Sequence, residues 1–295
     1  MPPRRVLILG HTGFIGRRLE ARLKETCPNL EIVGLSSSEL DLNDQESAAR
    51  SRGLFTPETA VAFCSAVKRQ FGDDLESFSR NLAMTLGLCR ILKERPVARL
   101  VYLSSAAVYG EDVHNLRITE RTPVIPRSYY GAAKIAAETL LTRLLAEPGQ
   151  GSFVSLRPPM VYGPGERVPA YGPGRFVSDI LAGREITLWG DGSERREFLF
   201  IDDVAETARR SLLGDFSGIV NIAAGVSYSF TEAIDVVSRL TGRRPRITSR
   251  PRTKGKVDHG FDNSLLTGLA PGLEFTSLDE GVEKTLAGRA GSGSA

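Results

Sequence analysis

Residues 6–16 read VLILGHTGFIG, an apolar run of strand length that leads directly into a glycine-rich turn. The helix-like sequence RRLEARLKE follows at once. A strand, a glycine turn and a helix in this order form the first half of a mononucleotide-binding unit. Gly10 permits the tight turn, Gly13 lets a pyrophosphate approach the backbone, and Gly16 permits close packing of the helix. The stretch therefore predicts a dinucleotide-binding fold.

Apolar segments of strand length alternate with helical segments through the next 140 residues or so. This alternation predicts a parallel sheet that is covered on both faces and binds ligands at the carboxyl ends of its strands. We therefore predict an α/β fold, a Rossmann-type doubly wound parallel sheet with a smaller C-terminal substrate-binding lobe. The predicted strands are residues 6–9, 31–35, 59–65, 99–103 and 153–156, with 220–223 returning to the same sheet, and helices are expected near Gln45, over 78–92 and from Tyr130 to Leu145.

The amino-acid composition of the chain changes after the fifth predicted strand. Residues 157–174, RPPMVYGPGERVPAYGPG, are too rich in proline and glycine for a helix or a central strand, so we expect a long loop that enters a second lobe. That lobe is expected to contain helices over 176–182, 230–240 and 278–286, strands over 186–189 and 197–201, and a helix starting at Asp202-Asp203. The predicted domains are 1–157 plus about 198–224 for the dinucleotide, 158–197 and 225–287 for the substrate, and a flexible tail over 288–295.

The composition is ordinary for a soluble globular protein and indicates neither a nucleic-acid-binding nor a membrane protein. Of 295 residues, 41% are hydrophobic and 25% charged, and the net charge of +3 is too small and too dispersed to indicate nucleic acid. The three cysteines, Cys27, Cys64 and Cys89, show no metal-ligand spacing, and their odd number argues against a disulfide framework. We expect no metal, no membrane span and no signal peptide, and a cytoplasmic location.

A second group of polar residues follows the strand at 99–103. Tyr130 and Lys134 are four residues apart on a predicted helix, so they share one helix face. The Lys134 ammonium is then expected to lower the pKa of the Tyr130 phenol, which makes the phenol a general acid or base. Ser105, at the end of the strand, is placed to hydrogen-bond a substrate hydroxyl or ketone. An ordinary surface pair is the alternative interpretation of the tyrosine and lysine.

The residues after the second predicted strand bear on the choice of dinucleotide. A dinucleotide fold often carries an acid at this place to bind the adenosine ribose, but here the chain reads Ser36-Ser37-Ser38. Without a carboxylate to repel a 2′-phosphate, and with Arg17 or Arg18 in reach, NAD and NADP both stay open. Asp41 and Leu42 come next, where an adenine contact is expected; the alternative is that Asp41 and Asp44 only cap the following helix.

Across nearly its whole length the chain resembles the extended short-chain dehydrogenase/reductase family, in the branch of nucleotide-sugar epimerases, dehydratases and reductases. Five motifs in order carry the resemblance: Gly10-x-x-Gly13-x-x-Gly16, Ser104-Ser105-Ala106-Ala107-Val108-Tyr109-Gly110, Tyr130-x-x-x-Lys134, RPPMVYGPG at 157–165, and GDGSERREFLFIDDV at 190–204. The resemblance implies a nucleotide-diphosphate sugar as substrate and a homodimer formed through the helices around Asn81 and Tyr130.

The resemblance also implies roles for individual residues. Tyr130 would be the acid/base, Lys134 would hold the nicotinamide ribose, and Ser105 would bind the reacting oxygen. Arg196 would pair with the diphosphate of the sugar nucleotide; its alternative is a solvated charge in the run 194–197. Val161-Tyr162-Gly163 would help form the nicotinamide pocket. The residues expected to bind NAD or NADP are Gly10, Thr12, Gly13, Phe14, Ile15, Gly16, Ser36, Asp41, Leu42, Tyr130 and Lys134.

Three departures from the family pattern limit the assignment of a reaction. The dehydratases of this branch carry an acid pair where this chain has Ala106 and Ala107, so 4,6-dehydration is not expected. Met160 stands where many relatives have asparagine. The missing acid after the second strand, followed closely by Glu39-Leu40-Asp41-Leu42, resembles the 4-keto-sugar reductases, whereas the segment 105–109 resembles the epimerases.

Three functions follow from these observations. The leading one is an NAD(P)-dependent epimerase that acts, at C4, through a transient keto-sugar. The second is an NADPH-dependent reductase of a 4-keto-deoxysugar nucleotide, which uses the same residues in one direction only. The third is a non-catalytic dinucleotide-binding protein, which the intact set of Ser105, Tyr130 and Lys134 disfavours.

Overall fold

The computed structural model describes residues 2–169 and 171–290, which form two compact units. The first unit contains the residues up to Glu111, then Thr122–Pro158 and Ala205–Ile222. The second contains Asp112–Arg121, Pro159–Val204 and the residues from Ala223 onward. Residues 112–121 join the second unit because β5 (Asn115–Ile118) pairs with β14 (His259–Phe261).

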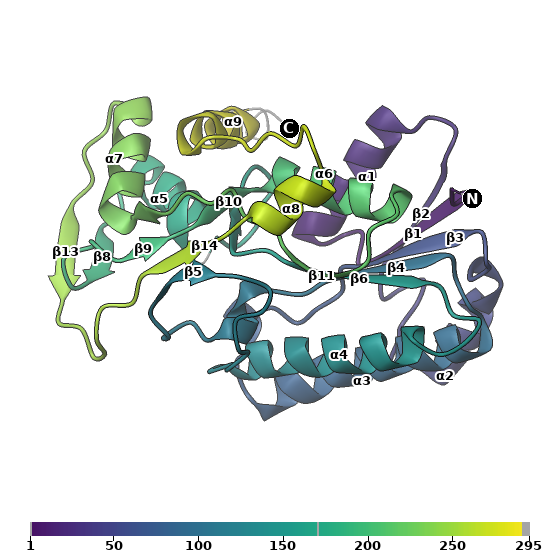
Figure 1. Cartoon of the computed structure of the whole chain (residues 1–295). Coiled ribbons are helices and arrows are strands. Elements are labelled where there is room, and N and C mark those ends of the chain that lie inside the picture. Colours follow the sequence, from purple (N-terminus) through teal and green to yellow (C-terminus); the bar gives the residue numbers. More distant parts are fainter. Residues whose placement is uncertain (1, 170, 291–295) are drawn as a thin grey trace. The chain divides into compact units, whose positions relative to one another are not determined.

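The first unit is built on a six-stranded parallel sheet with the strand order β11-β6-β4-β3-β1-β2. Helices α2, α3 and α4 lie on one face of this sheet, and α1 and α6 lie on the other (Figure 1). This confirms the predicted α/β fold with a doubly wound parallel sheet. The elements are β1 (Arg5–Leu9), α1 (Phe14–Thr26), β2 (Glu31–Leu35), α2 (Gln45–Ser51), η1 (Arg52–Leu54), β3 (Thr59–Phe63), η2 (Arg69–Phe71), α3 (Leu75–Glu94), β4 (Arg99–Leu103), η3 (Ala106–Tyr109), α4 (Tyr129–Leu145), β6 (Ser152–Arg157), α6 (Ile201–Leu213) and β11 (Gly218–Asn221).

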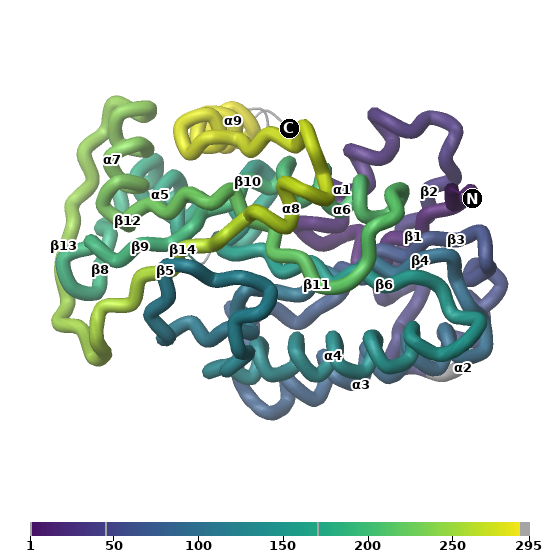
Figure 2. The backbone as a smooth tube through the Cα atoms, viewed as in Figure 1, coloured from purple at the N-terminus to yellow at the C-terminus, as the bar shows by residue number. Residues whose placement is uncertain are grey.

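The central strands are mostly apolar because both faces of the sheet are covered. Every residue of β3 and β4 is buried, and so are four of the five residues of β1. Their side chains pack with the inner faces of α3 and α4, where Leu88, Ile91 and Leu141 are almost fully buried. The edge strand β11 lies beside β6 although it comes from a much later part of the chain (Figure 2).

The second unit consists of short two-stranded sheets and helices. The pairs are β10 with β7, β12 with β9, β13 with β8, and β14 with β5. Trp189 ends β8 and keeps 54% of its surface exposed. The remaining elements of this unit are β7 (Met160–Tyr162), α5 (Gly172–Leu181), β8 (Ile186–Trp189), β9 (Arg195–Arg196), β10 (Phe198–Phe200), β12 (Tyr228–Ser229), α7 (Phe230–Thr241), β13 (Ile247–Arg250), α8 (Ser264–Leu269) and α9 (Leu278–Ala290).

Several predicted boundaries need correction. Helix α3 starts three residues before the predicted Phe78 because Asp74 and Ser77 form a capping box. The predicted loop over 157–174 is wrong at two places, since it contains β7 and the start of α5. Proline is accepted there because Pro173 lies in the first turn of α5, where its missing N–H is not needed.

The sequence also led to expectations about the C-terminal tail, membrane spans and metal sites. The predicted flexible tail 288–295 overlaps the last turn of α9, and residues 291–295 lie outside the described part of the chain. Within residues 2–169 and 171–290, no helix is long and apolar enough to cross a membrane. The same residues contain no group of three or more His, Cys, Asp or Glu side chains arranged to hold a metal ion.

Candidate active site

The glycine turn between β1 and α1 has the geometry that a bound pyrophosphate requires. Gly10 has φ +83°, and a Cβ added at Gly16 would lie 2.3 Å from the Gly10 carbonyl oxygen. Gly13 is the N-cap of α1, and neither a side-chain cap nor an acidic residue occupies the first turn of that helix. The N-terminal amides and the positive end of the helix dipole are therefore suited to an anionic group, so these residues fit a dinucleotide.

The side chains of the glycine turn alternate between solvent and core. Thr12 is exposed, Phe14 is buried in the packing of α1, and Ile15 is half-buried. Lys68 lies over the Phe14 ring, with its Nζ 5.3 Å from the ring centroid. The turn thus presents backbone and small residues on its open side, while Phe14 fixes the helix on the sheet.

The carboxyl end of β2 carries an acid that the sequence does not reveal. The Ser36 N–H donates to Glu39 Oε2 at 2.8 Å, and the Ser36 hydroxyl also donates to this carboxylate. The expectation that no carboxylate lies at this position is therefore wrong. The chain turns after Ser36, since the N–H of Leu40 donates to the Ser36 carbonyl at 2.9 Å, and this turn brings the Glu39 side chain back to the strand end.

Asp41, Leu42 and Asp44 follow this turn, and the sequence left open whether they contact adenine or cap the next helix. Asp44 is the N-cap of α2 and accepts the Glu46 N–H at 3.0 Å, which confirms the capping interpretation for that residue. Asp41 instead accepts the Asn43 N–H at 2.9 Å. Leu42 is 6% exposed and belongs to the core. An adenine contact by Asp41 and Leu42 stays a proposal.

The structure brings Ser105, Tyr130 and Lys134 together in the first unit. Tyr130 and Lys134 lie on α4, and the Ser105 hydroxyl after β4 hydrogen-bonds the Tyr130 phenol. Lys134 is 5% exposed, and its Nζ donates to the Leu103 carbonyl at 2.6 Å and lies 5.6 Å from the centroid of the Tyr130 ring. The surface-pair interpretation is therefore wrong, because the ammonium is buried and bonded to the end of β4.

The electrostatics differ from the sequence-based expectation. Burial raises the pKa of Tyr130 to about 12, the Ser105 hydrogen bond opposes this shift, and the charge of Glu111 adds to it. Burial also lowers the pKa of Lys134 to about 8. The predicted lowering of the Tyr130 pKa by Lys134 is thus wrong for this geometry, since the ammonium faces a backbone carbonyl and the faces of aromatic rings. At neutral pH the phenol is a proton donor.

The N-terminal turn of α4 is fixed by a polar network that no sequence pattern indicates. The backbone N–H of Tyr130 donates to Asp73 Oδ1 at 3.0 Å, and the hydroxyl of the N-cap Ser128 donates to Glu111 Oε1 at 2.8 Å. Arg69 forms an ion pair with each of these acids. Its Nε lies 3.1 Å from Asp73 Oδ2, and its Nη1 lies 2.9 Å from Glu111 Oε1. Arg69 therefore balances two negative charges beside the Tyr130 turn.

A buried ion pair fixes the same helix two turns further on. Both side chains of the pair of Glu138 and Arg157 are 2% exposed, and Arg157 Nε donates to Glu138 Oε1 at 2.9 Å. The Ser155 hydroxyl donates to the same carboxylate oxygen at 2.8 Å. On its other side, Arg157 Nη1 donates at 2.8 Å to the Tyr109 hydroxyl. Because Glu138 belongs to α4 and Arg157 to β6, the pair attaches the helix to the sheet.

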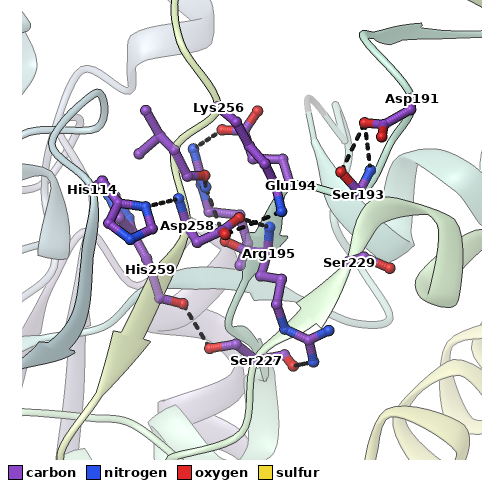
Figure 3. Close-up of polar contacts among 12 residues, drawn as sticks. His114, Asp191, Ser193, Glu194, Arg195, Ser227, Ser229, Lys256, Asp258 and His259 are labelled. Carbon is purple, nitrogen blue, oxygen red and sulfur yellow. Dashed lines mark hydrogen bonds and ion pairs between the residues drawn. The ribbon is translucent and has the colours of Figure 1, made fainter.

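Arg196 belongs to the second unit and is buried there. Figure 3 shows the polar contacts of its neighbours Glu194, Arg195 and Asp258. Its guanidinium donates to the Val257 carbonyl and to the Glu194 carboxylate. Next to it, the Arg195 N–H donates to Asp258 Oδ1 at 2.9 Å. Arg196 is only 9% exposed, so the solvated-charge interpretation is wrong for this residue. Its pairing with a diphosphate stays a proposal.

A glycine turn fit for a dinucleotide and an assembled Ser-Tyr-Lys set in one unit define an enzyme of the short-chain dehydrogenase/reductase type. The model of the NAD dependent epimerase/dehydratase family matches residues 6–223. The chain therefore belongs to the NAD-dependent epimerase/dehydratase family, and its cofactor is a nicotinamide adenine dinucleotide.

Curated relatives and solved structures agree with this assignment. A UDP-glucose 4-epimerase of Mycolicibacterium smegmatis is 28% identical over 96% of this chain and 97% of its own length. A dTDP-4-dehydro-6-deoxy-D-allose reductase of Streptomyces bikiniensis is also 28% identical, over 96% of this chain and 95% of its own. The crystal structure of the Thermus thermophilus UDP-glucose 4-epimerase with NAD superposes on this chain with a TM-score of 0.82. The match has 28% sequence identity and covers 98% of this chain and 99% of the epimerase chain. The predicted class of nucleotide-sugar epimerases and reductases is thereby confirmed.

Proposed function

We propose that the chain is an NAD-dependent epimerase that inverts C4 of a nucleotide-diphosphate sugar through a transient keto-sugar. The observation that carries this proposal is the contact of Ser105, Tyr130 and Lys134 in the unit that also contains the glycine turn. Two 4-epimerases, from M. smegmatis and T. thermophilus, are among the proteins similar to this chain along nearly its whole length.

Tyr130 is the residue that moves the proton. In its ionised form, the minor one at neutral pH, it takes the proton of the sugar hydroxyl when the carbinol is oxidised, and as the phenol it returns that proton when the ketone is reduced. A dinucleotide held at the glycine turn would supply the hydride acceptor for the carbinol carbon and, once reduced, the hydride donor for the ketone. Ser105 hydrogen-bonds the reacting oxygen and, through its bond to the phenol, favours the ionised form of Tyr130. Lys134 holds the nicotinamide ribose from its buried position on α4.

Loss of water from the sugar ring is not part of the proposed reaction. Residues 106 and 107, which follow the serine, are alanines at the start of η3, and the Ser105 hydroxyl accepts the Ala107 N–H at 3.2 Å. A 4,6-elimination needs a proton donor and acceptor on the carbons beside the ketone, and a methyl side chain supplies neither. The segment therefore supports epimerisation or reduction.

A reductase is the second candidate, because the S. bikiniensis relative at 28% identity reduces a 4-keto-deoxysugar nucleotide according to its name. In that reaction Tyr130 supplies its proton to the ketone once, and hydride comes from a reduced dinucleotide that must then leave. The raised pKa of Tyr130 suits this donor role.

The substrate is proposed to be held through Arg196, with its diphosphate accepted by the guanidinium. Such an interaction must replace or share the bond to Glu194, because this carboxylate faces the same guanidinium. Val161 and Gly163 are proposed to line the nicotinamide pocket by their backbone, since the Tyr162 side chain is 2% exposed and packs on Phe200. We further propose that the enzyme works in the cytoplasm as a homodimer.

The test is the conversion of UDP-glucose and UDP-galactose by the purified protein, followed by chromatography of the sugar nucleotides. An epimerase interconverts them without net change in NADH absorbance. A reductase leaves both unchanged and consumes NADPH when it is given a dTDP-4-keto-6-deoxysugar. Tyr130→Phe lowers either activity by roughly two to four orders of magnitude, whereas Tyr129→Phe, at the exposed neighbour, leaves it intact. Full activity of Tyr130→Phe contradicts the proposed site.

A further inference from the structure

A strongly basic segment of the chain includes β13 in the second unit. Residues 243–256, RRPRITSRPRTKGK, contain seven arginine and lysine residues and no acid. Because the whole chain has a net charge of only +3, its other residues are together net acidic. Six of the seven basic residues are exposed, and Arg252 is half-buried. The positive charge is therefore more concentrated than the net charge of the chain indicates.

Only part of this charge is balanced by acids. The three basic residues after β13 form ion pairs within the second unit, namely Arg252 with Asp191, Lys254 with Asp112 and Lys256 with Asp258. Arg244, Arg246 and Arg250 differ from them, because no acid of residues 2–169 and 171–290 forms an ion pair with any of these three. Three guanidinium groups in and just before β13 are thus available to an anionic partner.

The single tryptophan of the chain lies beside this charge. Figure 1 shows β13 next to β8, and the parallel register places Arg250 opposite Trp189. The Arg250 guanidinium carbon lies 6.0 Å from the centroid of the Trp189 ring, and 54% of the Trp189 surface is exposed. Thr187 and Thr248 share this face, with their hydroxyl oxygens 3.3 Å apart. The other two side chains of β8 are buried, so this face is the outer one.

The outer face of β8 and β13, together with residues 243–256, is called the basic face. Its combination of groups fits the surface of an anionic membrane. Anionic headgroups attract clusters of Lys and Arg, and an amphipathic indole is stable at the boundary between headgroups and acyl chains. A membrane surface is also broad and laterally mobile, so it can meet unevenly spaced positive charges without a preformed groove.

Two other kinds of partner fit the basic face less well. Addition of a peptide strand to the edge of β13 is disfavoured, because Pro245 and Pro251 flank this short strand. Single-stranded nucleic acid is held by several aromatic rings on which successive bases stack, whereas β8 and β13 together contain one aromatic residue.

We propose that the basic face binds the surface of a membrane that contains anionic phospholipids. Trp189 enters the headgroup region, and Arg244, Arg246 and Arg250 pair with lipid phosphates. Binding of this kind needs no membrane-spanning helix. It is also independent of the proposed reaction, because the basic face contains none of the residues proposed to act on the substrate or the dinucleotide.

The experiment uses the purified full-length protein and phospholipid vesicles. Vesicles of phosphatidylcholine with roughly one third phosphatidylglycerol are compared with vesicles of phosphatidylcholine alone. Because Trp189 is the only tryptophan, its fluorescence reports contact at the basic face directly. With the anionic vesicles we expect its emission to shift to shorter wavelength and to be quenched by brominated acyl chains. Both effects should weaken at high salt and be absent with phosphatidylcholine alone.

Variants then test the contribution of the unpaired arginines by co-sedimentation with the anionic vesicles. Each Lys or Arg near an anionic surface strengthens binding about fivefold, so Arg244→Gln/Arg246→Gln/Arg250→Gln should weaken it roughly a hundredfold. The matched control removes three positive charges from exposed positions of the first unit, in Arg50→Gln/Lys93→Gln/Arg95→Gln. It should weaken binding less than about threefold, because screening limits the effect of distant charges. Thermal melts followed by circular dichroism check that both variants are folded.

Three results would overturn the proposal. The first is no binding to anionic vesicles at low salt. The second is binding that leaves the Trp189 emission unchanged or that both triple variants weaken equally, since a different surface would then meet the lipid. The third is tighter binding of polyuridylic acid than of anionic vesicles at physiological salt, which would assign the basic face to nucleic acid. None of these results bears on the interconversion of sugar nucleotides, which is measured without vesicles.

Discussion

Replacing Glu138 with methionine tests how strongly the buried ion pair holds helix α4, which carries Tyr130 and Lys134. The substitution keeps the length of the side chain but removes the acceptor for Arg157 Nε and Nη2 and for the Ser155 hydroxyl. The guanidinium stays almost completely buried, with 2% of its side chain exposed. Leaving one charge of a buried pair without its partner costs about 3–5 kcal/mol. A domain stability of about 5–15 kcal/mol would lose about a fifth or more of its value.

The assay is urea unfolding followed by far-ultraviolet circular dichroism, supported by thermal melts. With an unfolding entropy of about 2 cal/mol/K per residue, a loss of about 4 kcal/mol lowers the Tm by roughly 6 °C for a chain of this length. The double variant Glu138→Met/Arg157→Met removes both charges and should recover most of the loss, because a well-packed apolar pair avoids the desolvation of an unpaired ion. Glu147→Gln, on the exposed surface after α4, is the control.

Two results would refute this reasoning. The first is a loss below about 1 kcal/mol in Glu138→Met, which would mean that water or a shifted side chain solvates the guanidinium. The second is a double variant that is as unstable as the single one, which would assign the loss to packing and not to the unpaired charge.

Three further predictions concern the active site and the pH dependence of stability. Tyr130→Phe should lower turnover by roughly two to four orders of magnitude and leave dinucleotide binding nearly unchanged, as measured by steady-state kinetics and calorimetry, with Tyr129→Phe as control. Arg69→Gln removes the positive charge that balances Glu111 beside the phenol, so the basic limb of the pH profile of kcat should move to higher pH. Arg69→Lys should restore the wild-type position of this limb. If the limb does not move in Arg69→Gln, the role of Arg69 is only structural. Burial raises the pKa of Glu197 to about 7. The stabilising contribution of Glu197 is therefore present below about pH 4.5 and is lost as the pH rises to about 7. In Glu197→Gln, the free energy of unfolding measured in urea should change less with pH across this range. A wild-type protein whose free energy of unfolding does not fall across this range would contradict the raised pKa.

The sequence predicts the sheet and the proposed catalytic residues because both rest on local patterns. The strand, glycine turn and helix of residues 6–26 need no tertiary information, and the spacing of Tyr130 and Lys134 places them on one helix face wherever that helix packs. The order of the predicted strands then puts Ser105 beside them. These features depend on period and spacing alone.

The remaining features of the site depend on turns and on contacts distant in sequence. Glu39 is missed because its carboxylate reaches the end of β2 only through a turn that ends at Leu40. Asp73 meets the Tyr130 N–H across a separation of 57 residues, which no local pattern encodes. The sign of the Tyr130 pKa shift is also missed, because spacing gives the proximity of Lys134 but not the burial that opposes ionisation.

The position of β11 in the sheet has a consequence for synthesis on the ribosome. β11 pairs with β6 through Asn221 and Arg157, so the edge of β6 stays unpaired until the later segment has emerged. At about 5–20 residues per second, translation of the intervening segment takes roughly 3–13 s. During that time the nascent chain presents a strand edge with unpaired backbone groups, the kind of edge that recruits other strands. Chaperone binding to nascent chains halted between these two strands should therefore exceed binding to chains halted after β11.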